Sequence, residues 1–175
     1  ILILGDQVDA ILIETVSDIY EMKAAVLAAK ENSDLPIFSS MTFGESGKTL
    51  MGTTPTAMVT FLEGIGVDCL GINCSLGPKE MEPIVEEILS VARIPVIVQP
   101  NAGLPVFSGN ETVYNVSVEE FCEYIYKFVK AGVSVVGGCC GTTPEYIRGI
   151  SNLLQNEKLA RRVNSPRTCI SSGSV

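Results

Sequence analysis

The chain has 175 residues, of which 46% are hydrophobic and 18% are charged, so it is long enough for one globular domain with a substantial core. Its formal net charge is −8 and no stretch clusters Lys and Arg, which argues against nucleic-acid binding. No apolar run approaches the roughly 20 residues of a membrane span. Histidine is absent, which excludes a Ser-His-Asp triad, a Cys-His pair and a histidine-ligated metal.

Hydrophobic periodicity alternates between the strand type and the helix type five times along the chain. The predicted strands are short apolar runs at 8–16, 35–43, 67–74, 94–100 and 133–140. A predicted helix follows each of them, at 18–31, 54–66, 77–92, 117–132 and 142–155. The segment 101–116 is expected to be a long loop.

Capping signals predict where the helices begin. Ser17 is the expected cap of the first helix and Thr54 of the second, and Ser117 with Glu120 forms a capping box at the start of the fourth. Pro83 must fall in about the first turn of the third helix, because proline cannot donate an interior helical hydrogen bond.

Strands without polar alternation are buried on both faces, which is typical of parallel sheets. Five strand–helix units fit either a doubly wound sheet or a (β/α)8 barrel. A barrel usually needs about 200 residues or more, so this chain would hold the last five of eight units. We expect residues 1–160 to form that part of a barrel and 161–175 to be a linker toward a following domain. The apolar start without Met suggests a piece of a longer protein.

In both architectures, functional residues gather at the carboxyl ends of the strands. Three cysteines, two asparagines and a glutamate are predicted to meet at this edge: Cys74, Cys139, Cys140, Asn73, Asn101 and Glu14. Each polar residue has two open interpretations. Glu14 either accepts a hydrogen bond from a substrate ammonium group or caps nearby backbone, and the asparagines either orient a ligand or satisfy loop backbone.

The chain contains six cysteines and does not begin like a signal peptide, which favours free thiols in a reducing, cytoplasmic compartment over disulfides. Cys74, Cys139 and Cys140 together suit Zn²⁺, since three thiolates leave one tetrahedral position open. Glycines around the adjacent pair let the backbone turn tightly. The alternative, a small buried hydrophobe, is the preferred interpretation for Cys69 and Cys122.

A nucleotide-binding loop is the weakest of the candidate sites. Gly47, Lys48 and Thr49 match the end of a phosphate-binding loop, G-x-x-x-x-G-K-[ST]. Its first glycine would have to occupy the position of Thr42, and no helix begins directly after the match. A loop at the edge of the sheet is the better interpretation.

The motifs GINCSLGP and GGCCGTTPE, supported by LIETVSD, SMTF and PNAG, resemble the homocysteine S-methyltransferase domain family over about residues 1–155. The resemblance is strongest to the homocysteine-binding module of its cobalamin-dependent branch. It implies a (β/α)8 TIM barrel with zinc at the carboxyl mouth and homocysteine sulfur as the fourth ligand. The implied zinc ligands are Cys74, Cys139 and Cys140. The implied substrate-binding residues are Glu14, Asn73, Ser75 and Asn101.

The implied reaction is methyl transfer to the homocysteine thiolate, giving methionine, with methylcobalamin on another domain as the donor. The implied partners are the missing N-terminal barrel units and the cobalamin and folate domains, and the chain alone is expected to be inactive. Other interpretations stay open. In one, the methyl acceptor is another thiol or a selenol, or the methyl donor is a betaine or sulfonium compound. In another, the chain is a non-catalytic zinc-binding half-barrel that docks with a partner.

Overall fold

The computed structural model describes residues 7–108, 111–158 and 168–172. Its centre is a five-stranded parallel sheet with the strand order β1-β2-β3-β4-β7. The strands are β1 (Ile11–Val16), β2 (Ile37–Met41), β3 (Cys69–Asn73), β4 (Val96–Gln99) and β7 (Val135–Val136). The helices are α1 (Ile19–Asn32), α2 (Pro55–Ile65), α3 (Pro78–Val91), α4 (Val118–Ala131) and α5 (Pro144–Leu154).

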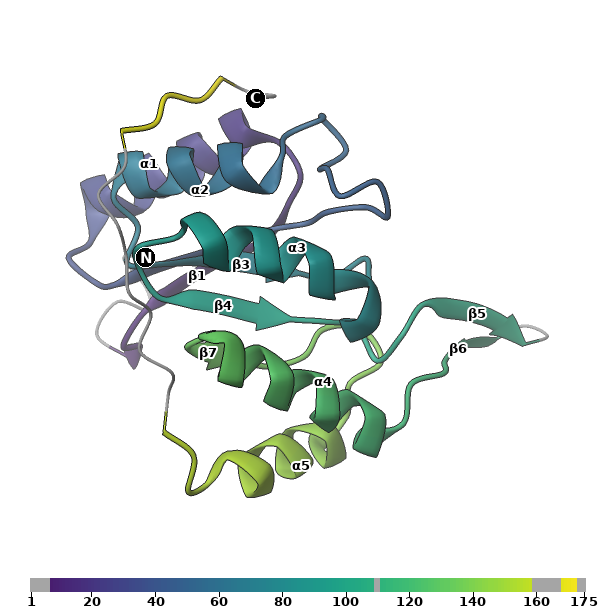
Figure 1. Cartoon of the computed structure of the whole chain (residues 1–175). Helices are drawn as coiled ribbons and strands as arrows, with labels where there is room; N and C mark the ends of the chain where they lie inside the picture. The colour runs from purple at the N-terminus through teal and green to yellow at the C-terminus, as the bar shows by residue number, and fades with distance from the viewer. Residues whose placement is uncertain (1–6, 109–110, 159–167, 173–175) are drawn as a thin grey trace.

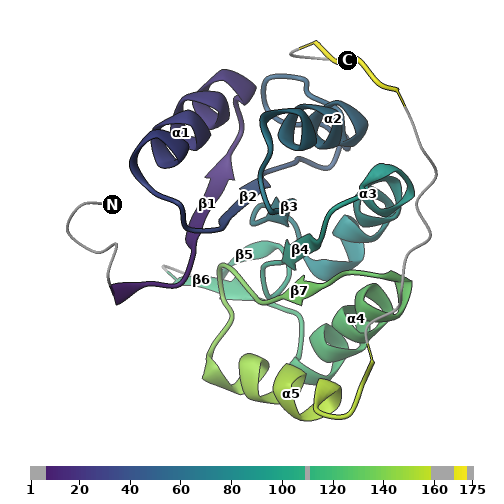
Figure 2. The same ribbon diagram turned by 90° about the vertical axis from the view of Figure 1, so that its left-hand side faces the viewer.

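The sheet winds in one direction, because its spatial order follows the chain without a reversal. The five helices lie in an arc around the outside of the sheet (Figure 2). A doubly wound sheet would reverse its strand order and carry helices on both faces, so the barrel interpretation is confirmed. The described residues form five of the β/α units of such a barrel, and within them β1 and β7 each pair with one neighbour only.

The core lies between the sheet and the helices. Helices α1 to α4 each bury an apolar stripe toward the sheet, represented by Met22 and Val26 of α1 and Leu62 of α2, whereas α5 packs on α4 and buries Ile150. Strand β3 is buried at every position. A β-carbon on its Gly71 would overlap the carbonyl oxygen of Ile97 on β4, so only glycine permits this close approach of the two strands.

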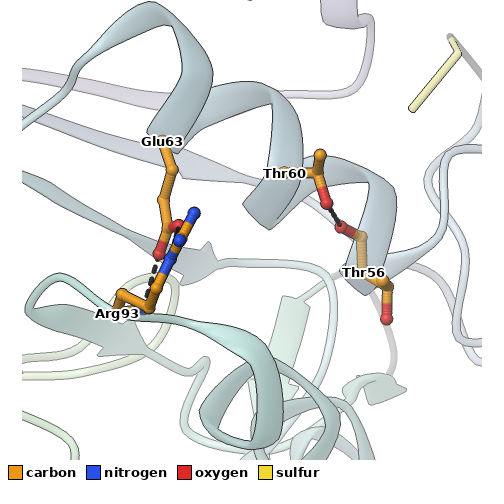
Figure 3. Close-up of polar contacts among 4 residues, drawn as sticks. All are labelled: Thr56, Thr60, Glu63 and Arg93. Atoms are coloured by element: carbon orange, nitrogen blue, oxygen red, sulfur yellow. Dashed lines mark hydrogen bonds and ion pairs between the residues drawn. The ribbon is translucent and has the colours of Figure 1, made fainter. Parts of the chain in front are cut away.

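Helix α2 is tied to the segment that enters β4 by a polar contact on the outside of the fold (Figure 3). The Glu63 carboxylate accepts hydrogen bonds from the backbone N–H of Arg93 at 2.5 Å and from its side-chain Nε at 2.8 Å. On the same helix, the Thr60 hydroxyl donates to the carbonyl oxygen of Thr56. The Glu63–Arg93 contacts therefore link two neighbouring β/α units.

Three local expectations differ from the structure. Helix α1 is capped by Asp18 rather than Ser17, because the Asp18 carboxylate accepts hydrogen bonds from the backbone of Tyr20 and Glu21. Pro83 is the sixth residue of α3 and so lies in its second turn. Only two residues of the fifth predicted strand, Val135 and Val136, pair with β4.

The predicted loop 101–116 contains a two-stranded antiparallel hairpin of β5 (Pro105–Ser108) and β6 (Glu111–Tyr114). It extends from the end toward which β4 points (Figure 1). Most of the predicted linker lies outside the described residues, and 168–172 forms no helix or strand. Among the helices described, none has the length and apolar character needed to cross a membrane.

Candidate functional site

Cys74, Cys139 and Cys140 come together at the carboxyl edge of the sheet. The Sγ atoms of Cys74 and Cys140 are 3.7 Å apart, those of Cys139 and Cys140 are 3.9 Å apart, and all three lie within 4.8 Å of one another. Tetrahedral Zn²⁺ with bonds of about 2.3 Å separates its sulfur ligands by about 3.8 Å. The donor set and its spacing therefore fit a thiol-ligated metal.

Cys74 is presented by an unusual backbone conformation directly after β3. Its φ is 61° and that of Ser75 is 65°, both in the left-handed region that side chains other than glycine rarely adopt. The Cys74 N–H donates to the carbonyl oxygen of Gln99, and its own carbonyl accepts from Leu76 N–H. Such strain costs about 1–3 kcal/mol per residue and tends to occur at functional sites.

The adjacent pair is held by backbone contacts with the loop after β4. Cys139 N–H donates to the carbonyl oxygen of Pro100, and the carbonyl oxygen of Cys140 accepts from Ala102 N–H. The buried Asn101 accepts a hydrogen bond from Cys140 N–H at 3.1 Å. Asn101 thereby fixes the cysteine pair. Its predicted substrate contact stays a prediction.

Asn73 is fully buried below the cysteines, and its amide is occupied by protein groups. Its Oδ1 accepts from Thr15 N–H at 2.8 Å and from Ser40 Oγ at 2.6 Å. Its Nδ2 donates to Thr15 Oγ1 at 2.6 Å and lies 3.9 Å from Cys139 Sγ. Thr15 has a φ of 63°, which is rare for a β-branched residue. The geometry gives Asn73 a supporting role, and its predicted substrate contact is untested.

Glu14 and Gln99 form a polar pair at the ends of β1 and β4. Glu14 is exposed, and Gln99 Nε2 donates to its Oε2 at 3.4 Å. The Oε1 atom of Gln99 is buried without a hydrogen-bond partner. The sequence analysis assigned Gln99 no role. The signal that could have identified it is its position as a polar residue at the end of an apolar strand.

Ser75, which follows Cys74 in the chain, is exposed and lines a cavity of about 340 Å³. The polar residues around this cavity include Thr42, Ser46, Lys48 and Thr49. The loop that matches the end of a phosphate-binding motif therefore borders the same edge of the sheet. The predicted site residues therefore share one edge, with the cysteines as its densest cluster.

The thiols influence one another electrostatically. Burial, followed by the hydrogen bond and negative charge of Cys74, raises the pKa of the Cys139 thiol to about 12. Burial and the charge of Cys140 also raise the pKa of Tyr114. The Cys139 thiol therefore keeps its proton at neutral pH, whereas a bound metal ion would favour its thiolate.

A single-wound parallel β/α sheet with three clustered thiols at its carboxyl edge defines a barrel protein with a site suited to a soft or borderline metal. The family model for homocysteine S-methyltransferase matches residues 2–154, and the chain belongs to that family.

Curated relatives are much longer than this chain. It is 39% identical over 170 residues to the methionine synthase of Mycobacterium tuberculosis, covering 94% of this chain and 14% of that protein. It is 40% identical over 149 residues to the methionine synthase of Mycobacterium leprae, covering 82% of this chain and 12% of that protein.

Solved structures show the same fold. The metallated form of the homocysteine methyltransferase MmuM from Escherichia coli matches with a TM-score of 0.70 at 24% identity, covering 86% of this chain and 46% of that chain. Its oxidized form matches with a TM-score of 0.69 at 25% identity, covering 85% and 47%. The chain thus spans about half of that barrel enzyme.

Proposed function

We propose that this chain is the zinc- and homocysteine-binding part of an enzyme that methylates homocysteine to methionine. The observation that carries the proposal is the cluster of Cys74, Cys139 and Cys140, whose sulfur spacing matches a tetrahedral zinc site. Family membership supports homocysteine as the methyl acceptor. The metallated form of the E. coli relative supports metal binding by this chain.

Cys74, Cys139 and Cys140 would hold the zinc, and the bound ion would supply the Lewis acidity that favours the thiolate form of the substrate sulfur at neutral pH. This chemistry suits a chain without histidine, which has no imidazole to serve as a general base. The substrate thiolate then attacks the methyl carbon of the donor. A new sulfur–carbon bond replaces the bond between donor and methyl group, and the electron pair of the broken bond leaves with the donor.

The residues of this chain bind and orient the amino acid. Glu14 is exposed at the edge of the sheet and would accept hydrogen bonds from the substrate ammonium group. Gln99 donates a hydrogen bond to the Glu14 carboxylate and so orients it. Asn101 keeps the Cys140 backbone in place. Ser75 borders the adjoining cavity and is free to contact the substrate or the approaching donor.

The donor and the rest of the barrel lie on other parts of a longer protein. The methionine synthases that the chain resembles are far longer than it, which leaves room for a cobalamin domain and a folate domain. The outer edges of β1 and β7 are the places where the remaining barrel strands would pair. We place the enzyme in the cytoplasm, where a reducing environment keeps the three thiols available.

Calorimetry of homocysteine binding tests the proposal. We expect homocysteine to bind the zinc-loaded chain with release of a proton, and to bind the metal-free chain far more weakly. Homoserine, which carries oxygen in place of sulfur, is the matched control and is expected not to compete. Equal homocysteine affinity with and without zinc would overturn the proposed function.

A further inference from the structure

The last described residues of the chain lie against helices of its first β/α units. Residues 168–172 form no helix or strand. In both views this yellow segment lies on the outer side of α2, at the opposite side of the molecule from α5 (Figure 1 and Figure 2). The end of the described chain is therefore next to helices that are distant from it in sequence.

Cys169 borders a groove between α2 and α3. It lines a cavity of about 160 Å³ together with Thr60 and Gly64 of α2 and Val91, the last residue of α3. Thr60 and Gly64 are four residues apart on one helix and so share a face. A β-carbon on Gly64 would meet no atom within 4 Å, so the groove has open space at this position.

Ser171 and Ser172 border a second groove, between α1 and α2. They line a cavity of about 170 Å³ together with Lys23 of α1 and Phe61 of α2. Phe61 directly follows Thr60, and successive residues of a helix point about 100° apart around its axis. The two cavities therefore flank α2, and the segment 168–172 crosses this helix from one cavity to the other.

The side chains of the segment alternate between groove and solvent. Cys169 and Ser171 line the two cavities, whereas Ile170 between them is 96% exposed. Alternation of this kind is typical of an extended backbone. The small side chains face the helices and the large one faces outward, which suits narrow grooves between neighbouring helices.

We propose that residues 168–172 form a strap that docks across the outer side of α2 and links the helices of the first three described β/α units. The occupant of both grooves is this segment of the same chain. The strap involves neither metal nor homocysteine, so its test is independent of the proposed function.

A disulfide between the strap and α2 tests the docking in the full chain. Gly64→Cys and Thr60→Cys each place a thiol in the cavity that Cys169 borders. We expect mild oxidation to join one of these thiols to Cys169 in most chains, as read by peptide mass mapping. Gly64→Cys is expected to fold, because it replaces a glycine inside a helix and its side chain enters open space.

Ser151→Cys is the matched control, since it places an exposed thiol on α5, much closer to Cys169 along the chain. An undocked tail would favour this shorter loop, because the entropic cost of closing a loop grows with its length. We expect a severalfold lower disulfide yield with Cys169 in Ser151→Cys than in the better of the two α2 variants. An equal or higher yield in Ser151→Cys, or no disulfide in either α2 variant, overturns the strap. A disulfide that joins two chains, detected by non-reducing electrophoresis, also overturns it, because a second copy would then occupy the groove.

Discussion

Cys74 is the one ligand of the proposed zinc site that comes from a different loop than the other two. It follows β3, whereas Cys139 and Cys140 follow β7, and their sulfurs meet because both strands end at one edge of the sheet. The site therefore depends on the fold as much as on the residue types.

Replacing Cys74 tests that dependence. In Cys74→Ser we expect the bound zinc to fall from one equivalent to none under the same conditions, because two thiolates and a hydroxyl hold zinc poorly. Metal analysis after gel filtration measures the stoichiometry. Cys169→Ser, which alters an exposed cysteine of the tail, is the control and is expected to retain zinc. Full retention in Cys74→Ser would contradict the assignment.

The raised pKa of Cys139 predicts that zinc affinity depends on pH. The thiol titrates at about 12 in the metal-free chain, so zinc must displace its proton at neutral pH. We expect the apparent affinity between pH 6 and 8 to rise by about tenfold per pH unit for each proton displaced. Competition with a chelator at several pH values measures it, and an affinity that does not change with pH contradicts the account.

The same pKa shift affects the stability of the metal-free chain. A folded-state pKa above the ordinary thiol value of about 8.5 means that the folded chain holds this proton more tightly than the unfolded chain. The stability contributed by Cys139 is therefore present below about pH 8.5 and lost as the pH rises toward 12.

Gln99 is expected to matter through Glu14. Gln99→Leu removes the hydrogen bond to the Glu14 carboxylate while keeping a side chain of similar size. We expect homocysteine affinity of the zinc-loaded chain to fall by about tenfold, which corresponds to the low end of the roughly 1.5–3 kcal/mol for a hydrogen bond to a charged group. Calorimetry measures this affinity. Gln155→Leu, on the exposed end of α5, is the matched control, and equal affinities for both variants would remove Gln99 from the site.

At the scale of elements, the ends of the helices were predicted more accurately than the ends of the strands. Caps and glycine stops are local signals, and they predicted the helices to within two residues at either end. Strand ends depend on pairing with a neighbour, which a single sequence does not reveal. The fifth strand was predicted over 133–140 but pairs only at Val135 and Val136.

The hairpin was missed for a different reason. Its two strands of four residues are separated by Gly109-Asn110, which is a local hairpin signal, but the short runs on either side carry little apolar alternation and 101–116 was predicted as a loop. The cysteine cluster was predictable because strand ends in a parallel sheet share one edge. Gln99 was assigned no role, since its contact with Glu14 arises only from tertiary packing.

The cap of α1 allows a direct test at this scale. Asp18→Ala removes the carboxylate that accepts hydrogen bonds from Tyr20 and Glu21 N–H, and we expect the free energy of unfolding to fall by about 1 kcal/mol. Ser17→Ala is the control and is expected to change it by less than about 0.5 kcal/mol. Urea denaturation measures both, and a larger loss for Ser17→Ala would restore Ser17 as the cap.

At the scale of the whole molecule, the described residues form an open arc of a barrel. Strand β1 leaves Leu12 44% exposed beside an edge without a pairing partner among the described residues. The E. coli relative, of which the chain covers about half, shows that further barrel units accompany this arrangement in that protein. Under the proposed function, complete catalysis needs further barrel units, whereas the residues proposed to bind metal and substrate lie in this chain.

X-ray absorption at the zinc edge tests the central claim most directly. The account predicts three sulfur ligands and one lighter ligand in the zinc-loaded chain, with a fourth sulfur replacing the lighter ligand when homocysteine is added. A zinc shell that holds four sulfurs before homocysteine is added, or one that does not change afterwards, would contradict it.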